Sequence, residues 1–597
     1  MTAQQLITQN LDLWSSAVKN RSSAGRGSSK KLELYGIKKL RELILELAVR
    51  GLLVEQDPND EPASELLKKI AAEKARLIKE GNIKKKKPLP SIGEDEKTNF
   101  LPSGWEFVRL NDLGEWGAGA TPKRGNSELY GGAIPWFKSG ELTGDYISES
   151  EETVTEIALK QASLRYNKPG DVLLAMYGAT IGKTAILSVH ATTNQAVCAC
   201  TPFSGFSNIY LLTLLKAFRP RFIGMGAGGA QPNISREKII ATVIALPPEA
   251  EQHRIVAKVD ELMTLCDQLE QQQENSISAH KTLVETLLSS LVNAAEKGGS
   301  TTKAGGNAGK AAAFSGQQVW ARIAEHFDTL FTTEHSIDQL KQTILQLAVM
   351  GRLVPQDPDD EPASKLLERI ASEKQQLIKD GKIKKNKPFI NFDGLDDLKK
   401  PLPESWEWIK LADTADLVRG GSPRPAGDPK FYDGEIPFLK VGDVTRKMSK
   451  FVEGFNSTIK EAGLNKTRMI QVRTVLLSNS GATLGIPAIC DFTATFNDGI
   501  AAFVEQSKYV FDEYLYLYLS TLSKWFLDIA SQGQGQPNLN TDIIKTTWFA
   551  LPPLPEQHRI VAKVDELMTL CDTLKANLQN AQSTQLSLTD SLVELAL

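Results

Sequence analysis

Basic and amide side chains gather on predicted loops at two corresponding places in the chain. One group is Thr121-Pro-Lys123-Arg124 with Lys138 further on, and the other is Ser422-Pro-Arg424 with Lys440. Arg and Lys can neutralise phosphates or pair with guanine, and Asn and Gln suit the edge of adenine. These residue types therefore predict contacts to a nucleic acid. The candidate contacts are Thr121, Lys123, Arg124, Lys138, Tyr177, Gln231 and Asn233, then Ser422, Arg424, Lys440, Asn479, Gln536 and Asn538.

A simpler interpretation stays open for each of these residues taken singly. Pro135-Trp136 and Pro437-Phe438 can anchor strands while the nearby lysines are only solvated. Charge does not decide between the two, because residues 101–245 carry 13 basic and 12 acidic side chains and residues 401–550 carry 15 and 17. The whole chain of 597 residues has a formal charge of −3, so charge alone does not indicate a nucleic-acid partner.

Two glycine-rich segments resemble nucleotide-binding loops but lack the required spacing or context. Residues 178–184 have three residues between their glycines, where a phosphate-binding loop needs four, and residues 481–487 lose the lysine and the hydroxyl. Residues 224–229 fit G-x-G-x-x-G, but Ala-Gln-Pro follows instead of a helix, and residues 531–536 do not fit. We expect a glycine-rich hinge there.

The sequence gives no sign of a catalytic or metal centre. It holds no Asn/Asp-Pro-Pro-Tyr/Phe tetrapeptide, with which adenine methyltransferases hold a flipped base. The five cysteines form no C-x-x-C pair and the six histidines are scattered. His253 and His558 lie in a predicted packing helix, where a structural role is the more common one. No signal peptide or apolar run of about 20 residues is present, so we expect a cytoplasmic protein without a membrane span.

The sequence contains an internal repeat that spans most of its length. Residues 40–88 and 340–388 are identical at 32 of 49 positions, and residues 251–267 are repeated without change at 556–572. Between these segments the two copies diverge and keep only a thin skeleton of shared residues, such as Gly178-Ala-Thr and Gly481-Ala-Thr. A common frame carrying two different inserts suggests one task performed on two different targets.

The sequence predicts helices for the shared segments and α+β domains for the inserts. Leu40, Ile44 and Leu47 recur at helical spacing, and Asp60-Glu61-Pro62 predicts the cap of a second helix that stops at Gly81. Within the inserts, residues 171–178 and 473–481 predict buried strands, and residues 206–218 and 510–526 predict one packed helix each.

The repeated segment after each insert predicts a long helix. Its apolar face comprises Ile255, Val259, Leu262, Met263 and Cys266, and we expect this seam to continue through Leu269, Ile277, Leu283, Leu287 and Leu291 in the first copy and Leu574, Leu578, Leu588, Leu592 and Leu595 in the second. Residues 275–279 can break the first helix. The predicted organisation is a helical frame segment (1–100), a first domain (101–245), a central helix (246–295), a flexible linker (296–317), a second frame segment (318–400), a second domain (401–550) and a C-terminal helix (551–597).

The tandem order of variable domain and Leu-Pro-Pro helix resembles the specificity subunit of type I restriction-modification enzymes. The resemblance rests on the EQHRIVAKVDELM helix after each insert, on Gln-Pro-Asn shortly before it, and on Trp105 and Trp406 after Leu-Pro at the start of each domain. It covers nearly the whole chain. It implies two α+β target recognition domains in pseudo-two-fold relation, joined by long antiparallel coiled-coil helices.

The resemblance also implies the function and the partners. Each domain would read one half of a split, asymmetric double-stranded DNA site, and the chain would scaffold two methyltransferase subunits and the restriction subunits. No cofactor would bind to this chain, because S-adenosylmethionine, ATP and Mg would belong to the partners. Two alternatives stay open: a coiled-coil adaptor that does not read DNA, and a methyltransferase or nuclease that acts alone.

Overall fold

The computed structural model describes residues 3–21, 31–85, 87–97, 100–226, 232–297, 323–385, 395–531 and 538–597. The chain divides into two compact units, residues 1–276 with 581–597, and residues 277–580. The predicted linker lies outside the described residues, except for its first two positions.

In unit 1, a helical layer precedes the first domain. Its elements are α1 (Ala3–Gln9), α2 (Leu11–Ser16), the hairpin of β1 (Lys19–Arg21) and β2 (Lys31–Glu33), α3 (Tyr35–Val49) and α4 (Ala63–Lys79). The predicted stripe is confirmed, because α3 buries Leu40, Ile44 and Leu47 on one face. At the turn after α3, Gly51 has a φ of +70°, and a Cβ there would lie 2.5 Å from Cγ of Pro102. Glycine at this turn therefore lets the start of the domain pack against the helix.

The predicted cap of α4 is wrong in its detail. The N-cap residue is Pro62, and no side chain accepts a hydrogen bond from the first turn. The Asp60 carboxylate instead accepts two hydrogen bonds from Arg254, at 3.2 and 2.6 Å. Asp60, which the sequence predicted to cap α4, therefore forms an ion pair with Arg254 of the long helix that follows the domain. The predicted stop is confirmed, since α4 ends at Lys79 and Gly81 has a φ of +75°.

The first domain is built from two sheets and a two-stranded ribbon. The five-stranded sheet has the order β4-β11-β8-β9-β6, the second sheet has the order β10-β5-β7, and β12 pairs with β3. The predicted strand is present as β8, whose four residues are all buried. The strands are β3 (Glu106–Arg109), β4 (Gly114–Ala118), β5 (Tyr130–Phe137), β6 (Tyr146–Ile147), β7 (Thr153–Val154), β8 (Val172–Ala175), β9 (Thr184–Leu187), β10 (Thr192–Thr193), β11 (Val197–Pro202) and β12 (Val243–Leu246).

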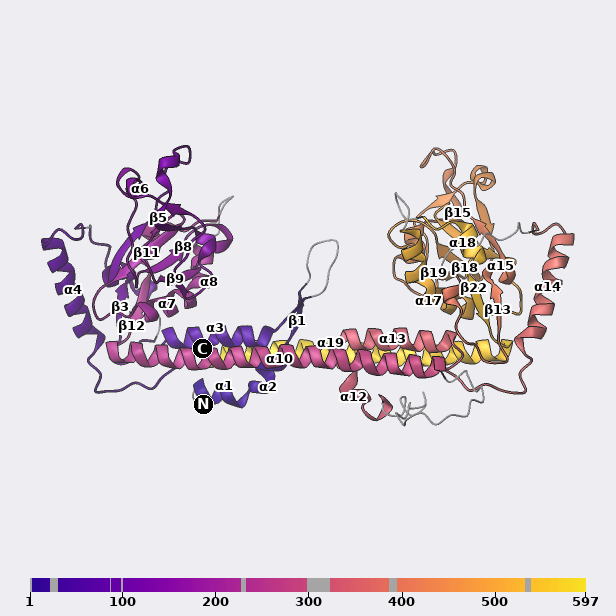
Figure 1. Ribbon diagram of the computed structural model, residues 1–597, viewed down its shortest axis with the longest axis horizontal. Helices are drawn as coiled ribbons and strands as arrows, with labels where there is room; N and C mark the ends of the chain where they lie inside the picture. Colours follow the sequence, from indigo (N-terminus) through magenta and orange to yellow (C-terminus); the bar gives the residue numbers. More distant parts are fainter. Residues whose placement is uncertain are drawn as a thin grey trace. The chain divides into compact units, whose positions relative to one another are not determined.

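The predicted helix of this domain is α7 (Asn208–Ala217), which lies between the larger sheet and α3 (Figure 1). Four shorter helices accompany it: α5 (Leu110–Leu113), α6 (Glu156–Gln161), α8 (Arg219–Gly226) and α9 (Arg236–Ala241). Gly224 and Gly226 lie in α8 and not in a hinge, while the rest of that glycine-rich segment falls outside the described residues.

Unit 2 repeats this plan. Its helices are α12 (Phe327–Leu330), α13 (Glu334–Val349), α14 (Ala363–Lys379), α15 (Leu411–Thr414), α16 (Val441–Thr445), α17 (Asp512–Ala530) and α18 (Thr541–Thr546). Its sheets have the orders β14-β21-β18-β19, β16-β15-β20-β17 and β13-β22. The strands are β13 (Glu407–Lys410), β14 (Asp416–Arg419), β15 (Tyr432–Leu439), β16 (Thr458–Ile459), β17 (Arg468–Ile470), β18 (Thr474–Ser478), β19 (Pro487–Cys490), β20 (Ala494–Phe496), β21 (Ile500–Val504) and β22 (Trp548–Leu551).

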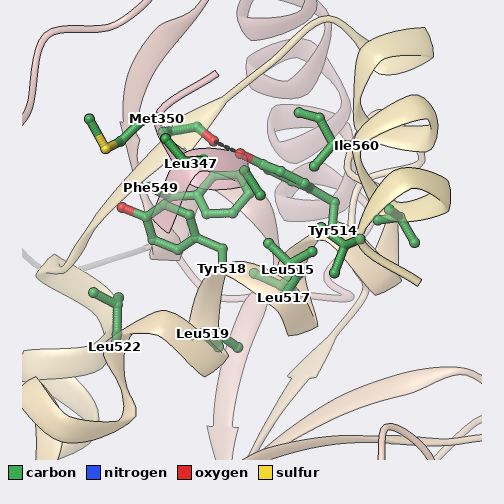
Figure 2. Packing of buried hydrophobic residues seen from close by; sticks show 14 of the residues in the cluster. Leu347, Met350, Tyr514, Leu515, Leu517, Tyr518, Leu519, Leu522, Phe549 and Ile560 are labelled. Carbon is green, nitrogen blue, oxygen red and sulfur yellow. Dashed lines mark hydrogen bonds between the residues drawn. The ribbon is translucent and has the colours of Figure 1, made fainter. Parts of the chain in front are cut away.

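The core of unit 2 joins its domain to its frame helices. Tyr514 and Tyr518 of α17 pack with Phe549 of β22, and Leu347 of α13 lies in the same cluster (Figure 2). The Tyr514 hydroxyl donates to the carbonyl of Ala550 at 3.1 Å, which satisfies the buried phenol. Domain and frame therefore share one hydrophobic core.

Two long helices complete the units, α10 (Glu249–Lys297) and α19 (Leu554–Ala596). The helix α10 runs without interruption through residues 275–279, which the sequence had left as a possible break. Its first part belongs to unit 1 and its second part to unit 2, and α19 is divided the other way round. Each unit therefore contains the start of its own long helix and the end of the other.

Within unit 1 the two long helices run antiparallel. Arg41 of α3 binds Asp267 of α10 at 2.7 Å, and Gln56 further along the chain binds Glu251, so α10 runs against this segment. Tyr35 binds Asp590 of α19 at 2.7 Å and Arg50 binds the carbonyl of Leu597, so α19 runs along it. The antiparallel arrangement expected from the sequence is thus present within this unit.

The apolar seam keeps its predicted start, passes one residue beyond the predicted Leu283 and Leu287, and coincides with the prediction again at Leu291. Ile255, Val259, Leu262 and Cys266 are buried as predicted. In unit 2 the seam then passes through Val284, Leu288 and Leu291, while Leu283 is 51% exposed. Leu588 and Leu595 of α19 are also exposed, at 51% and 78%. The polar stretch between the two parts of the seam fixes no register, so packing against α3 and α13 selects the buried face.

Candidate nucleic-acid interface

In the first domain, two loops meet where strand β8 ends. Tyr177 and Asn233 form an isolated antiparallel bridge, and the backbone N–H of Gly178 donates to the carbonyl of Pro232 at 2.8 Å. Gly178 has a φ of +62°, which favours glycine at this turn. Two segments that lie more than 50 residues apart in the chain are therefore held together.

The second domain forms the same junction, in which Gly-Ala-Thr and Gln-Pro-Asn are shared while Ser480 stands in place of Tyr177. Ser480 and Asn538 form the corresponding bridge, and the backbone N–H of Leu539 donates to the carbonyl of Asn479 at 2.7 Å. Gly481 has a φ of +85°. The junction is made by backbone groups, so the side chains on it are free to differ.

A third loop joins this junction in each domain. It contains Asn194 in the first domain, whose N–H donates to the carbonyl of Phe137 at 2.9 Å, the residue before Lys138. The loop is tied to the end of β8 because the N–H of Met176 donates to the carbonyl of Ala196 at 2.8 Å.

In the second domain this loop contains Asn497, which binds Leu439, the residue before Lys440, at 2.9 Å, and Asn479 donates to Gly499 at 2.9 Å. We call the three loops with the segment after β4 or β14 the loop cluster of each domain.

The segment after β4 or β14 completes each loop cluster through a hydroxyl group. Thr121 donates to Oε1 of Gln195, and Ser422 donates to Oδ1 of Asp498 at 2.6 Å. Gln195 and Asp498 each follow the shared asparagine of the third loop. Their types differ between the copies, so sequence comparison did not single them out, although their place after a shared residue was a usable signal.

The predicted cations of the first domain are partly neutralised within the protein. Arg124 and Lys138 both bind Glu152, at 2.6 and 2.5 Å, and the Arg124 guanidinium lies over the rings of Tyr130 and Trp136. The bonds from Lys138 and Arg124 hold the pKa of Glu152 below its ordinary value. In the second domain, within the described part of the chain, no carboxylate lies at ion-pair distance from Arg424 or Lys440.

The remaining candidates fall into three situations. Tyr177 is 42% exposed, and Lys123, Asn233 and Asn538 also lie at the surface. Asn479 is fully buried, and neither polar atom of its side chain has a hydrogen-bond partner among the described residues, so it is not a surface contact in this structure. Gln231 and Gln536 lie outside the described residues. The structure thus brings most, but not all, of the predicted residues into two equivalent loop clusters.

The repeated helix holds each domain through a separate set of bonds. The indole N–H of Trp105 donates to Glu251 at 2.9 Å, and Gln56 donates to the other carboxylate oxygen at 2.8 Å. The backbone N–H of Ser207 donates to Gln252 at 3.0 Å. In unit 2, Trp406 and Gln356 bind Glu556, and Phe511 binds Gln557. These bonds explain why the Glu-Gln pair is identical in both copies.

Burial of the two glutamates raises their pKa above the ordinary value of 4.5. The hydrogen bonds from the tryptophans and glutamines act in the opposite direction, because they stabilise the ionised carboxylate. Burial is the larger effect at both residues.

The described residues contain no group of three or more His, Cys, Asp or Glu side chains that could hold a metal ion. Among the same residues, no helix is long and apolar enough to span a membrane.

Comparison with known proteins decides the family. A family model described as the type I restriction modification DNA specificity domain matches residues 102–279 and 403–581. The specificity subunit of the Escherichia coli type I restriction enzyme EcoAI is 39% identical over 620 aligned residues, which cover both chains completely. The chain belongs to the family of type I restriction enzyme specificity subunits.

Further specificity subunits match over most or all of the chain. That of the E. coli enzyme EcoEI is 38% identical, again over both full lengths. That of Methanocaldococcus jannaschii MjaIX is 30% identical over 76% of this chain and 84% of its own. The crystal structure of the HsdS subunit from Thermoanaerobacter tengcongensis has a TM-score of 0.39 and 17% identity, covering 83% and 97%. The family matches confirm the predicted family and fold class, and they confirm a specificity subunit in place of an enzyme.

Proposed function

We propose that this specificity subunit reads a bipartite, asymmetric site in double-stranded DNA, one half with each domain. The observation that carries the proposal is the pair of loop clusters, which have the same backbone hydrogen bonds but different exposed side chains. Two loop clusters with the same backbone but different polar side chains are suited to recognise two different DNA sequences, because side chains on the surface select the bases. Residues 101–245 and 401–550 are the proposed reading domains.

Within each loop cluster, the proposed DNA contacts are the sequence candidates that lie at its surface. Among the described residues, no carboxylate lies at ion-pair distance from Lys440 or Arg424, although the charge of Arg424 acts on Asp498 at longer range. Lys138 and Arg124 are bound to Glu152, so a phosphate would have to compete with this carboxylate for them. Asn479 is omitted from these contacts because it is buried.

The proposed partners are two methyltransferase subunits and restriction subunits, assembled in the cytoplasm. On this proposal S-adenosylmethionine, ATP and Mg are bound by the partners, and the chain supplies discrimination between sequences. The sequence-independent attraction to phosphates would then come largely from the rest of the assembly, which agrees with a net charge of −3 for this chain.

Domain exchange tests the proposal. Residues 101–245 are replaced by the equivalent domain of another family member, the hybrid is produced with its methyltransferase partner, and methylated adenines are mapped across the genome. We expect one half-site to change and the other to stay. Cells without the chain should show no such methylation. A change in both half-sites, or methylation that does not depend on the chain, would contradict the proposal.

A further inference from the structure

The third loop of each cluster presents one side chain whose chemistry differs between the two domains. Gln195 follows Asn194, and Asp498 follows Asn497. The asparagine side chain accepts a hydrogen bond from the backbone N–H two residues on, at 3.1 Å from Ala196 and at 3.2 Å from Gly499. The backbone that carries Gln195 and Asp498 is therefore folded in the same way in both domains.

A glycine fixes the distance between this loop and the segment that packs on it. A Cβ at Gly119 would lie 2.2 Å from the carbonyl oxygen of Thr193, and one at Gly420 would lie 2.2 Å from that of Asn497. Real Cβ atoms do not approach an oxygen so closely, so these positions require glycine. This close approach lets Thr121 and Ser422 reach the side chains of Gln195 and Asp498.

The hydroxyl group orients each side chain, and within the described parts of the chain no other side chain binds its remaining polar edge. Thr121 donates to Oε1 of Gln195, which leaves the amide N–H₂ as a donor and a second lone pair on Oε1 as an acceptor. Ser422 donates to Oδ1 of Asp498, which leaves Oδ2 as an acceptor only.

The charge state of Asp498 supports this difference. The hydrogen bond from Ser422, a backbone hydrogen bond from Asp498 itself and the nearby Arg419 and Arg424 lower the pKa of Asp498, so it is ionised at neutral pH. The two loops thus offer a neutral donor–acceptor edge in one domain and a negative acceptor in the other.

We propose that Gln195 and Asp498 are specificity-determining residues, with Gln195 reading an adenine in one half-site and Asp498 accepting the amino group of a cytosine in the other. Glutamine can bond both N6 and N7 of adenine, and an aspartate suits the N4 amino group of cytosine while repelling the acceptors of guanine and thymine. The inference rests on the proposed function, because it names the contacts of the same two loop clusters.

The test uses the full chain assembled with its methyltransferase subunits. Methylated sites are mapped for the wild type, Asp498→Asn and Gln195→Glu, and the base preference at each position is measured by competition between duplexes. We expect Asp498→Asn to reduce the preference for cytosine at one position of one half-site by about tenfold to a hundredfold. Gln195→Glu should change one position of the other half-site, and neither variant should alter both.

Two further variants separate recognition from a structural role. Asp491→Asn makes the same chemical change at an exposed position of the second domain outside its loop cluster, and it should leave the site unaltered. Ser422→Ala removes the hydroxyl that orients Asp498 and should weaken the same base preference without creating a new one. Thermal melting and assembly with the methyltransferase are measured for every variant.

The outcomes distinguish the inference from the proposed function. If Asp498→Asn lowers methylation equally at all sites with no change of base, Asp498 is structural and the inference is wrong. The inference is also overturned if the half-site read by the second domain contains no G·C pair. If the wild-type complex shows no bipartite consensus, the proposed function itself fails.

Discussion

At the scale of single residues, the frame is constant because its side chains bind parts of the domain that need not vary. Glu251 accepts from the indole of Trp105, and Gln252 accepts from a backbone N–H. Arg254 binds Asp60, which is itself a frame residue. For these particular bonds, a new domain sequence has to supply one tryptophan and a correctly placed main chain, while the shared hydrophobic core requires apolar side chains in addition.

The tryptophan bond gives a first prediction. Trp105→Phe removes the indole donor and leaves one oxygen of the buried Glu251 carboxylate without a partner. We expect the unfolding free energy of unit 1 to fall by about 1–3 kcal/mol, the usual effect of an unsatisfied buried group. Chemical denaturation measures it, and the double variant with Glu251→Gln serves as the control. Equal effects of Trp105→Phe in both backgrounds would argue against the bond.

The raised pKa of Glu251 gives a prediction with a definite sign. The unfolded chain releases this proton near pH 4.5 and the folded chain only above that value. Folding is therefore penalised progressively as the pH rises through the interval just above 4.5, and the penalty is constant at higher pH. We expect the stability of the wild type relative to Glu251→Gln to fall through this interval. Denaturation curves at several pH values check it, and a difference that does not vary with pH would refute it.

At the scale of elements, each long helix serves two units. The pair Tyr35–Asp590 in unit 1 corresponds in sequence to His335–Glu285 in unit 2, where the side chains approach to 3.5 Å. Likewise Arg41–Asp267 corresponds to Lys341–Asp572. Both units thus combine the same three helix segments, although the chain supplies those segments in a different order.

Truncation tests this exchange. Removing residues 581–597 takes Leu592, Val593 and Ala596 away from the core of unit 1 and removes the partner of Tyr35. We expect hydrogen exchange to become faster in α3, while α13 in unit 2 keeps its protection. As a matched variant, Leu288→Ala removes an apolar side chain from α10 in unit 2 and should destabilise α13 by about 2–5 kcal/mol. Loss of protection in both units on truncation would show that the two cores are not separate.

At the scale of the whole molecule, we propose that the long helices set the distance between the half-sites. Inserting four residues after Asp267 lengthens α10 by about 6 Å at 1.5 Å per residue. It also changes the register between the segment held by Arg41 and the segment held by α13. Either the spacing between the half-sites changes or the complex fails to assemble. Mapping of methylated sites measures the spacing, and assembly with an unchanged spacing would contradict the role as a ruler.

The sequence by itself determined the repeat, the family, the buried strands β8 and β18 and the main helices of each domain. These features depend on local apolar periodicity and on the close similarity of the two copies, both of which are present in the linear chain. It also predicted that the candidate contacts lie on loops, because glycine and proline mark turns and polar residues between apolar runs mark surface; that these loops contact DNA stays a prediction.

Only the tertiary structure decided which of those side chains are available. Glu152, distant in sequence, neutralises Arg124 and Lys138, and the fold buries Asn479. Asp60, which the sequence predicted to cap a helix, forms an ion pair with Arg254 in the structure. The fold also brings Gln195 next to Thr121 and Asp498 next to Ser422. Such partnerships join residues far apart in the chain, so they depend on how the elements pack, which local patterns do not encode.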